Sequence, residues 1–360
     1  MEHAPLIVVG AGQAGLATAH EAARRGVRPL VLEAADHAGG AWPHHYDSLT
    51  LFSPARFSAL PGRPMPGDGD RYPRRDEVVA YLRAYARDLD ADTRYGRRVV
   101  AVDRDGDDGR DGHRGGGGTG GGGHLVVTTA DGTRFRTPAL VAATGGFSRP
   151  YRPALPGLHD FPGTVLHSSE YRSPERLAGR RVVVVGGGNS AVQIAAELAG
   201  TARVTVASRA PIAWVGQRPL GRDLHWWFVR SGLDTAPIRR FWERGPVLVM
   251  DDGRYRAAFD SGNPDRRPMF TGLSEHGVEW ADGTKEKVDA LVLATGFRPA
   301  LEYLEGTGAL DDDGRPLQSR GVSATVPGLG FVGLEFQRSF SSATLRGVGR
   351  DARHVLRRIL

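Results

Sequence analysis

The stretch Gly10-Ala-Gly12-Gln-Ala-Gly15 places three glycines at fixed spacing directly after the apolar residues 6–9, and it decides the fold. Four consecutive apolar residues suit a strand buried on both faces, and residues 16–25 continue with a helical pattern. Gly10 permits the tight turn, and Gly12 has no side chain, so the backbone can approach a pyrophosphate. Gly15 lets the helix pack closely on the strand. The pattern predicts a strand, a turn and a helix whose free N–H groups can hold a dinucleotide pyrophosphate.

An acidic residue ends the next expected strand. Residues 29–33 (Pro-Leu-Val-Leu-Glu) predict that strand, and Glu33 lies at the distance from Gly15 where a carboxylate can accept hydrogen bonds from a ribose. This favours a nucleotide with an unphosphorylated ribose, as in FAD or NAD. A glycine turn without any nucleotide is the alternative, and the strand, the helix and Glu33 in one register argue against it.

The same glycine pattern occurs a second time. Gly186-Gly-Gly188-Asn-Ser-Ala191 follows the apolar run 181–185, with Ala191 in the place of the third glycine, which the pattern permits. The next expected strand, 203–207, ends in Ser208-Arg209 instead of an acid. A guanidinium fork matches a phosphate, so this end favours a 2′-phosphate and therefore NADPH; the alternative is a surface arginine. Two turns predict two nucleotides, with a hydride passing between them.

The composition limits the class of protein. The chain has 360 residues and a net charge of +6, and arginine supplies all of its 47 basic residues except Lys285 and Lys287. No dense basic block occurs, so we expect no nucleic-acid partner. Cysteine is absent, and no HExxH or EF-hand spacing occurs, so we expect no disulfide, no redox dithiol and no metal. An early first strand and the lack of a long apolar run predict a cytoplasmic protein without a membrane span.

Two strands ending in Ala-Thr-Gly indicate how the chain is divided. These are residues 139–145 and 289–296, and each marks a place where the backbone can approach a nucleotide and cross between domains. We expect an α/β protein of two doubly wound, Rossmann-like domains, one formed by 1–155 and 292–360 and the other, 156–291, inserted into it. Residues 105–123 are almost all Gly, Asp and Arg, which predicts a mobile hairpin loop without function.

Residues 161–171 (Phe-Pro-Gly-Thr-Val-Leu-His-Ser-Ser-Glu-Tyr) match the FxGxxxHxxx(Y/F) fingerprint of flavin-containing monooxygenases. They lie between the two glycine turns, as in that family. With Gly39-Gly-Ala-Trp42, the Ala-Thr-Gly strands and residues 327–333, the resemblance covers nearly the whole chain. Within the superfamily, residues 46–54, 60–66 and 339–351 resemble a bacterial branch labelled CzcO-like, which includes monooxygenases of arsenic-resistance clusters.

The resemblance implies FAD in the outer domain and NADPH in the inserted one. It implies a monooxygenase in which NADPH reduces the flavin, and the flavin takes up O₂ as a hydroperoxide that oxygenates a small-molecule substrate. The FAD residues would be Gly10, Gly12, Gln13, Ala14, Gly15, Glu33, Gly40, Trp42, Val100, Thr144, Gly145 and Gly333. The NADPH residues would be Gly186, Gly188, Asn189, Ser190, Ala191, Ser208 and Arg209, with Thr295 and Gly296 at the return crossing.

Tyr171 bears on the class of substrate. Baeyer–Villiger monooxygenases carry Trp at this position, whereas enzymes that oxygenate nitrogen or sulfur carry Tyr or Phe. The resemblance therefore favours a small soft nucleophile, such as an amine, a sulfide or a trivalent arsenical, over insertion into a ketone. Two alternatives stay open: an NAD(P)H-flavin reductase or oxidase that oxygenates no substrate, and a non-catalytic redox-sensing regulator of ion transport.

Two side chains are candidates for a role beside the flavin. His167 could hydrogen-bond at the seam between the domains, or it could simply stabilise a turn. Ser53 could donate to the flavin, although a serine before a proline is commonly a turn residue, and relatives place Asn where Pro54 stands here. The aromatic residues 225–228 (His-Trp-Trp-Phe) could form a lid, a membrane contact or a homodimer face; we expect them to pack in the core of the inserted domain.

Overall fold

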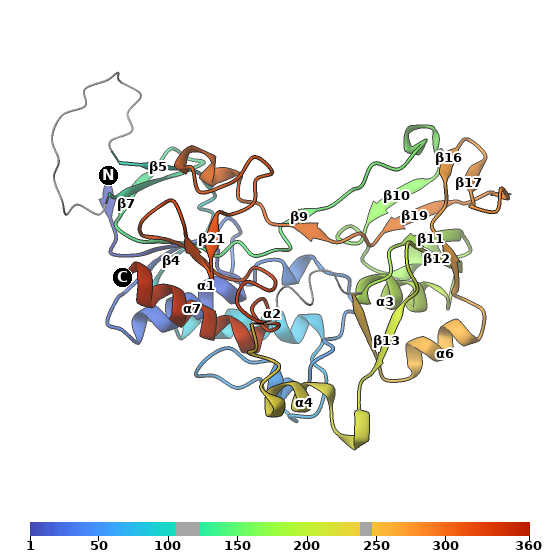
Figure 1. The fold of residues 1–360 in the computed structure, drawn as a ribbon, viewed down its shortest axis with the longest axis horizontal. Coiled ribbons are helices and arrows are strands. Elements are labelled where there is room, and N and C mark those ends of the chain that lie inside the picture. The colour runs from blue at the N-terminus through green and yellow to red at the C-terminus, as the bar shows by residue number, and fades with distance from the viewer. Residues whose placement is uncertain (106–122, 238–246) are drawn as a thin grey trace.

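The computed structural model describes residues 1–105, 123–237 and 247–360. The chain forms two lobes joined by a short ribbon of β9 (Arg149–Pro150) and β20 (Phe297–Arg298) (Figure 1). We call residues 1–150 and 297–360 the first lobe and residues 151–296 the second lobe. The predicted loop 105–123 lies, except at its two ends, outside the described residues. No helix in the described ranges is long and apolar enough to cross a membrane.

A seven-stranded sheet forms the centre of the first lobe, in the order β21-β22-β23-β8-β2-β3-β4. Its five strands from β23 to β4 are parallel, and β21 and β22 form an antiparallel edge. The strands are β2 (Ile7–Val9), β3 (Leu30–Leu32), β4 (Asp92–Arg94), β8 (Leu140–Ala142), β21 (Gln318–Ser319), β22 (Val322–Ser323) and β23 (Leu329–Phe331). The central strands are buried on both faces, as their unbroken apolar sequence requires.

The two faces of this sheet bury alternate residues of each strand. Leu6 and Val8 pack with three helices, α1 (Gln13–Ala23), α2 (Arg75–Arg87) and α7 (Leu345–Ile359). Ile7 and Val9 pack toward a second, four-stranded sheet. That sheet has the order β1-β7-β6-β5, formed by β1 (Glu2–His3), β5 (Val99–Arg104), β6 (Leu125–Thr129) and β7 (Arg134–Thr137).

The second lobe repeats this plan on a smaller scale. Its five parallel strands have the order β10-β19-β11-β12-β15, formed by β10 (Thr164–His167), β11 (Arg181–Val185), β12 (Arg203–Ser208), β15 (Asp265–Pro268) and β19 (Ala290–Leu293). Helix α3 (Asn189–Leu198) packs on one face, and the antiparallel strands β16 (Gly272–Ser274), β17 (Gly277–Glu279) and β18 (Lys285–Glu286) accompany the other. The predicted α/β class with two Rossmann-type units is confirmed.

The predicted element boundaries shift by a few residues. The predicted division at residue 292 falls inside β19, which as a whole belongs to the second sheet, so the chain returns to the first lobe only after Leu293. The first helix begins at Gln13 instead of residue 16, because the glycine turn leads straight into it and Gly12 is its N-cap. Hydrogen bonding starts before the apolar periodicity that marked the helix in the sequence.

An arm of the second lobe reaches back to the first. Strand β13 (Ala213–Gly216) leads to α4 (Leu224–Ser231), and the chain returns through β14 (Leu248–Asp251) and α6 (Arg254–Asp260) (Figure 1). The His225 ring stacks on Phe52 and Phe57 of the first lobe, at centroid distances of 6.0 and 6.4 Å. The Phe228 ring meets Phe340 of the first lobe, and Trp226 and Trp227 contact each other. The prediction that residues 225–228 pack in the core of the inserted domain was therefore wrong, because the partners of His225 and Phe228 come from the other lobe.

Candidate functional site

The two glycine turns are built in the same way. A Cβ on Gly10 (φ +102°) would lie 3.0 Å from the carbonyl oxygen of Ala143, and one on Gly186 (φ +142°) would lie 2.4 Å from that of Ala294. The parallel pairs β2–β8 and β11–β19 bring each turn beside the end of an Ala-Thr-Gly strand. Both turns thus lie at the carboxyl edge of a parallel sheet, where open α/β sheets bind their ligands.

The first turn is a cradle of bare backbone. A Cβ on Gly15 would lie 1.8 Å from the Gly10 carbonyl oxygen, so only glycine lets α1 start this close to β2. A Cβ on Gly40 (φ +57°) would lie 2.9 Å from the Gly12 Cα, and one on Gly333 (φ +93°) would lie 2.6 Å from the Cβ of Ala14. These predicted residues converge on the N-terminus of α1. An open helix end with no side chain over it fits a pyrophosphate.

Glu33 holds the shape of this cradle. It is buried, and its Oε2 accepts the Ala11 N–H at 2.6 Å while its Oε1 accepts the Ala35 N–H at 2.9 Å. A carboxylate has about four lone-pair positions, so acceptor capacity is left for a ribose. Val100 lies where β5 shifts register against β6 and is 47% exposed, and its predicted contact with FAD stays a prediction.

An aromatic cluster lies between the two turns, and we call Trp42, His45, Phe147, His167 and Phe297 the seam cluster. The Trp42 indole N–H donates to Gln13 Oε1 at 2.9 Å, which ties the cluster to the first cradle. The His45 ring lies 5.7 Å from Trp42, 6.4 Å from Phe147 and 6.2 Å from Phe297, and the last two rings lie 5.6 Å apart.

The sequence analysis missed Phe147 and Phe297. A signal was present, because both Ala-Thr-Gly segments are followed within two residues by phenylalanine. The repeat places one ring beside each cradle, and the β9–β20 ribbon brings the rings together. Only the pairing of the two crossings makes them neighbours.

His167 lies at the crossing between the lobes. Its Nδ1 accepts the Ser169 N–H at 3.1 Å, so the proton is assigned to Nε2, which lies 3.0 Å from the carbonyl oxygen of Gly296. Its ring meets Phe297 edge-on at 4.9 Å. Burial lowers the pKa of His167, although its bond to Gly296 opposes this. The contact fits the positioning role that the sequence suggested, linking the end of β10 to the return crossing.

Both imidazoles of the seam cluster have a lowered pKa. Burial, and then the charges of neighbouring His44, Arg172 and Arg75, lower the pKa of His45 to about 4. Burial also lowers the pKa of His167. The seam cluster is therefore an aromatic surface whose imidazoles resist protonation, while the guanidinium groups of Arg75 and Arg172 donate to the backbone carbonyl of His45.

Ser53 has its hydrogen-bond partner within its own turn. Its side-chain oxygen lies 2.8 Å from that of Ser58, whose hydroxyl also approaches the carbonyl oxygens of Ser53 and Pro54. Ser53 is 8% exposed. These contacts supply the turn role considered for this serine, and a contact with FAD stays a prediction.

In the two Ala-Thr-Gly segments, the threonine and the glycine have different roles. The hydroxyl of Thr144 donates to the Ala300 carbonyl at 3.3 Å, and that of Thr295 donates to the Tyr151 carbonyl at 2.5 Å. A Cβ on Gly145 or on Gly296 would meet nothing within 4 Å. The threonine hydroxyls thus hold the two crossing segments through backbone carbonyls, and the glycines border the open space in which a nucleotide could lie.

The second turn is anchored by side chains of α3. Asn189 Nδ2 donates to the Leu248 carbonyl at 3.0 Å, and its Oδ1 accepts the Met250 N–H at 3.1 Å, which ties the helix start to β14. Ser190 is half-buried beside it and Ala191 is fully buried. A Cβ on Gly188 would lie 3.4 Å from Val247. Asn189 thus fixes the start of α3 against β14.

Two arginines lie at the end of β12. Ser208 is buried, donates its hydroxyl to the Ala210 carbonyl at 2.8 Å and accepts from Nε of Arg266 at 3.1 Å. Arg209 is exposed, and within the described ranges its guanidinium has no ion pair or hydrogen bond. Arg266, on β15, was missed because only the β12–β15 pairing brings it here. Two guanidinium groups at the end of β12 suit the 2′-phosphate of NADPH.

Tyr171 does not line the seam. It is 1% exposed, its hydroxyl donates to Glu197 on α3 at 2.7 Å, and its ring lies 6.2 Å from that of Tyr46. It therefore packs on α3 of the second lobe, beside Tyr46 of the first. Its relation to the substrate class rests on the resemblance and not on a contact with the site.

Comparisons with known proteins agree with this architecture. The flavin-binding monooxygenase-like family model matches residues 4–233. An oxidoreductase of Geobacillus kaustophilus named CzcO-like is 29% identical over 100% of this chain and 99% of its own length. The indole-3-pyruvate monooxygenase YUCCA4 of Oryza sativa is 32% identical over 98% of this chain and 87% of its own length. The structure of a flavin-containing monooxygenase from Stenotrophomonas maltophilia superposes with a TM-score of 0.82 at 33% identity, covering 100% and 98% of the two chains.

Proposed function

Because the chain belongs to the flavin-binding monooxygenase-like family, we propose that it oxygenates a small soft nucleophile at a nitrogen, sulfur or trivalent arsenic centre. The protein is a flavin-dependent monooxygenase that uses FAD and NADPH. When bound, FAD accepts a hydride from NADPH and activates O₂. Over one turnover, NADPH, a proton, O₂ and the substrate would give NADP⁺, water and the oxygenated substrate.

The aromatic seam cluster carries this proposal. A soft nucleophile attacks as a neutral molecule, so its site needs an apolar wall and no proton donor that would protonate it or divert oxygen to peroxide. His45, with its pKa lowered to about 4, and His167, whose pKa burial also lowers, supply aromatic surface that resists protonation. Phe147 and Phe297 close the wall between the two cradles.

The chain's own residues would then bind and position. The bare turns at Gly10–Gly15 and Gly186–Ala191 would hold the two pyrophosphates. Arg209 and Arg266 would bind the 2′-phosphate of NADPH. His167, through its bond to the Gly296 carbonyl, would fix the distance between the lobes and so the alignment of nicotinamide and flavin.

One observation favours a second candidate. The relative from Oryza sativa is named for indole-3-pyruvate, a 2-oxo acid, and matches almost the whole chain. A 2-oxo acid is attacked at its carbonyl carbon, so that reaction needs a nucleophilic form of activated oxygen. If NADPH were oxidised without oxygenation of any substrate, the protein would act as a reductase or an oxidase instead.

The test is the fate of oxygen during turnover. Purified holoenzyme is supplied with NADPH and, in separate reactions, a thioether, a tertiary amine, a trivalent arsenical, a 2-oxo acid or a cyclic ketone. Consumption of NADPH and O₂, release of peroxide and formation of product are measured together. We expect an oxide of one of the first three, at close to one per NADPH. Oxygenation of the 2-oxo acid or ketone alone, or full conversion of O₂ to peroxide, would refute the proposal.

A pair of variants tests the seam cluster itself. Phe297→Leu removes the ring that meets His167, Phe147 and His45, and we expect a larger share of NADPH to be lost as peroxide. Phe259→Leu is the matched control, since Phe259 packs on Trp214 within the second lobe. Equal coupling in both variants would show that the cluster does not protect the reaction.

A further inference from the structure

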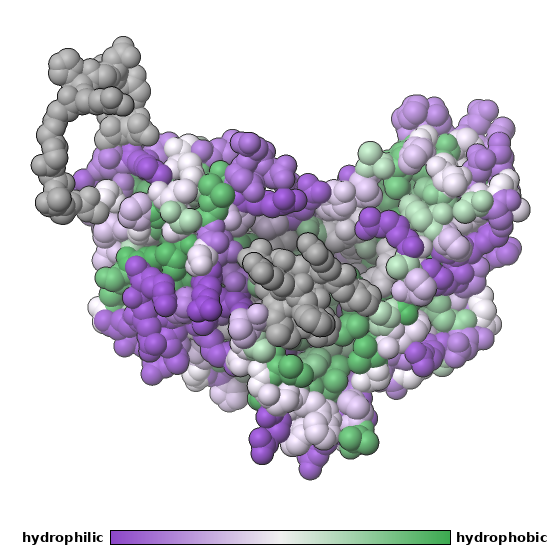
Figure 2. Space-filling model, in the orientation of Figure 1, coloured by the Kyte–Doolittle hydropathy of each residue, from purple (hydrophilic) through white to green (hydrophobic). Residues whose placement is uncertain are grey.

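An arginine-rich surface covers the outer side of α7, away from both glycine turns. The helix buries Val348, Ala352, Val355 and Leu356 against the first lobe. Its opposite side carries Arg350, Arg353, Arg357 and Arg358. Figure 2 shows hydrophilic residues gathered over the part of the first lobe where α7 lies. No step of the monooxygenase reaction uses this surface.

The surface is hollowed. A cavity of about 310 Å³ is lined by Arg338, Arg350, Arg353, His354, Arg357 and Arg358, which we call the arginine basin. Asp351 is the one acidic residue in its lining. A second cavity of about 240 Å³ adjoins it, because Arg350 and Arg353 line both. The larger volume is at the lower end of the range found for small-molecule sites.

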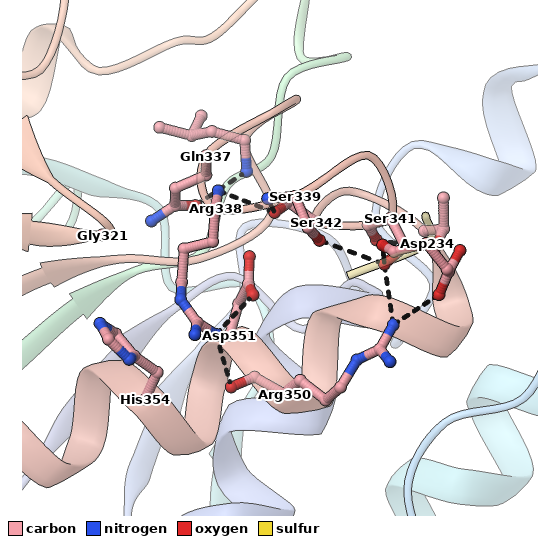
Figure 3. A network of polar contacts seen from close by, with 12 residues as sticks. Asp234, Gly321, Gln337, Arg338, Ser339, Ser341, Ser342, Arg350, Asp351 and His354 are labelled. Atoms are coloured by element: carbon pink, nitrogen blue, oxygen red, sulfur yellow. Dashed lines mark hydrogen bonds and ion pairs between the residues drawn. The ribbon is translucent and has the colours of Figure 1, made fainter. Parts of the chain in front are cut away.

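The acids near the basin lie beneath it. Arg338 donates to Asp351 at 3.1 Å, Arg353 contacts Glu21 at 2.9 Å and Arg350 contacts Asp234 at 2.6 Å. Each of these three acids is about 2% exposed. Figure 3 shows Arg338 and Arg350 held by Asp351 and Asp234 in this way. The carboxylates therefore fix the arginines from the protein side and leave the mouth of the basin cationic.

The mouth has no counter-charge of its own. Arg357 and Arg358 are exposed, and within the described part of the chain neither forms an ion pair. Arg358 donates to Nδ1 of His354 at 3.1 Å, so the His354 proton is assigned to Nε2. That nitrogen is buried and has no partner, and the same holds for Nε of Arg338. Among the described residues, two buried N–H donors thus lack acceptors, and the buried Oδ2 of Asp351 in the same lining lacks a donor.

The electrostatic surroundings of His354 point to the same ligand charge. Burial, and after it the charges of Arg338, Arg358, Arg320 and Arg357, lowers the pKa of His354 to about 4. Burial alone lowers a histidine pKa, so only the contribution of these arginine charges reports a positive potential in the basin. An anion in the basin would pair with its exposed guanidinium groups and offset this potential.

We infer that the arginine basin binds a small anion carrying two or more phosphate or carboxylate groups. Planar guanidinium forks match both groups in a bidentate manner. The hollow, in which several guanidinium groups surround one volume, favours a small molecule over a flat surface such as a membrane. The basin shares no residue with the two nucleotide cradles, so both kinds of ligand can bind at once.

The probe is inorganic pyrophosphate, titrated calorimetrically into the full chain already saturated with FAD and NADP⁺ in a chloride buffer. We expect saturable binding at one site in addition to the filled cradles. Arg357→Ala with Arg358→Ala should weaken this binding at least about tenfold, because two charge-assisted contacts are lost. Both residues are exposed and form no ion pair with the described residues, and Arg358 contacts only the neighbouring turn of its own helix, so the variant should fold as the parent does.

The control removes the same charge elsewhere. Arg83→Ala with Arg87→Ala lowers the net charge equally, on the exposed side of α2, and should leave pyrophosphate binding within about twofold of the parent. Citrate serves as the carboxylate probe, and vesicles with anionic phospholipid serve as the membrane probe. Equal loss in both double variants, no binding of either small anion, or binding to vesicles alone would overturn the inference. None of these readouts depends on catalytic turnover.

Discussion

The preference for NADPH over NADH should depend on two arginines at the end of β12. Arg209 is exposed and has no partner among the described residues, whereas the Nε of Arg266 already donates to Ser208. A charge-assisted hydrogen bond contributes about 1.5–3 kcal/mol, and solvent around an exposed guanidinium reduces this. We take about 2 kcal/mol for Arg209, which corresponds to a change of about thirtyfold in Kd.

Arg209→Ala should therefore raise the Kd for NADPH about thirtyfold and leave that for NADH unchanged within about twofold. Arg266→Ala should cost less, about fivefold, because only its terminal nitrogens are free to meet the phosphate. Arg209→Lys keeps the charge but loses the fork, so it should fall between the parent and the alanine variant. The assay is anaerobic flavin reduction over a range of each nucleotide. Equal losses for NADPH and NADH would refute the assignment of Arg209 to the 2′-phosphate.

Three further outcomes follow from the structure. Asp234 has a side chain that is 2% exposed and pairs with two arginines of α7. Asp234→Asn should therefore lower the free energy of unfolding by about 3 kcal/mol in denaturant titrations. A loss below about 1 kcal/mol would mean that the α4 arm is held by packing alone. Gly15→Ala places a methyl group 1.8 Å from the Gly10 carbonyl and should yield protein without bound flavin absorbance, whereas a yellow, FAD-loaded variant would contradict the cradle. His45 has its folded pKa lowered to about 4, so its contribution to stability is complete above pH 6.5 and is lost as the pH falls toward 4. His45→Gln should therefore lose about 2 kcal/mol less than the parent between pH 7.5 and 4.5, and identical pH profiles would show that His45 is not the titrating group.

The local architecture of both cradles was predictable from sequence. Each glycine pattern stands directly after an apolar run. The backbone atoms that exclude a side chain at Gly15 and Gly186 belong to the same turn or to the end of the neighbouring strand. Glu33 likewise ends the strand next to its turn. These contacts join neighbouring elements of one Rossmann unit, and such units pair their strands in a nearly fixed order.

The seam, the arm and the basin were not predictable in this way. Phe147 and Phe297 meet only because β9 pairs with β20, and Arg266 reaches Ser208 only because β15 pairs with β12. The run 225–228 has an amphipathic pattern that any apolar surface could cover, and the structure places it on the other lobe.

The sequence by itself thus determined two nucleotide cradles, because each depends on steric and hydrogen-bonding rules that act over one strand, one turn and one helix. Only the tertiary structure decided which aromatic rings separate the cradles, which second arginine lies at the ribose end, and where the arginines of α7 gather above buried carboxylates. Those arrangements join residues of different elements that are distant in the sequence, by 58 positions for Ser208 and Arg266 and by 116 for Asp234 and Arg350. No local pattern records which of many compatible apolar and charged surfaces will meet.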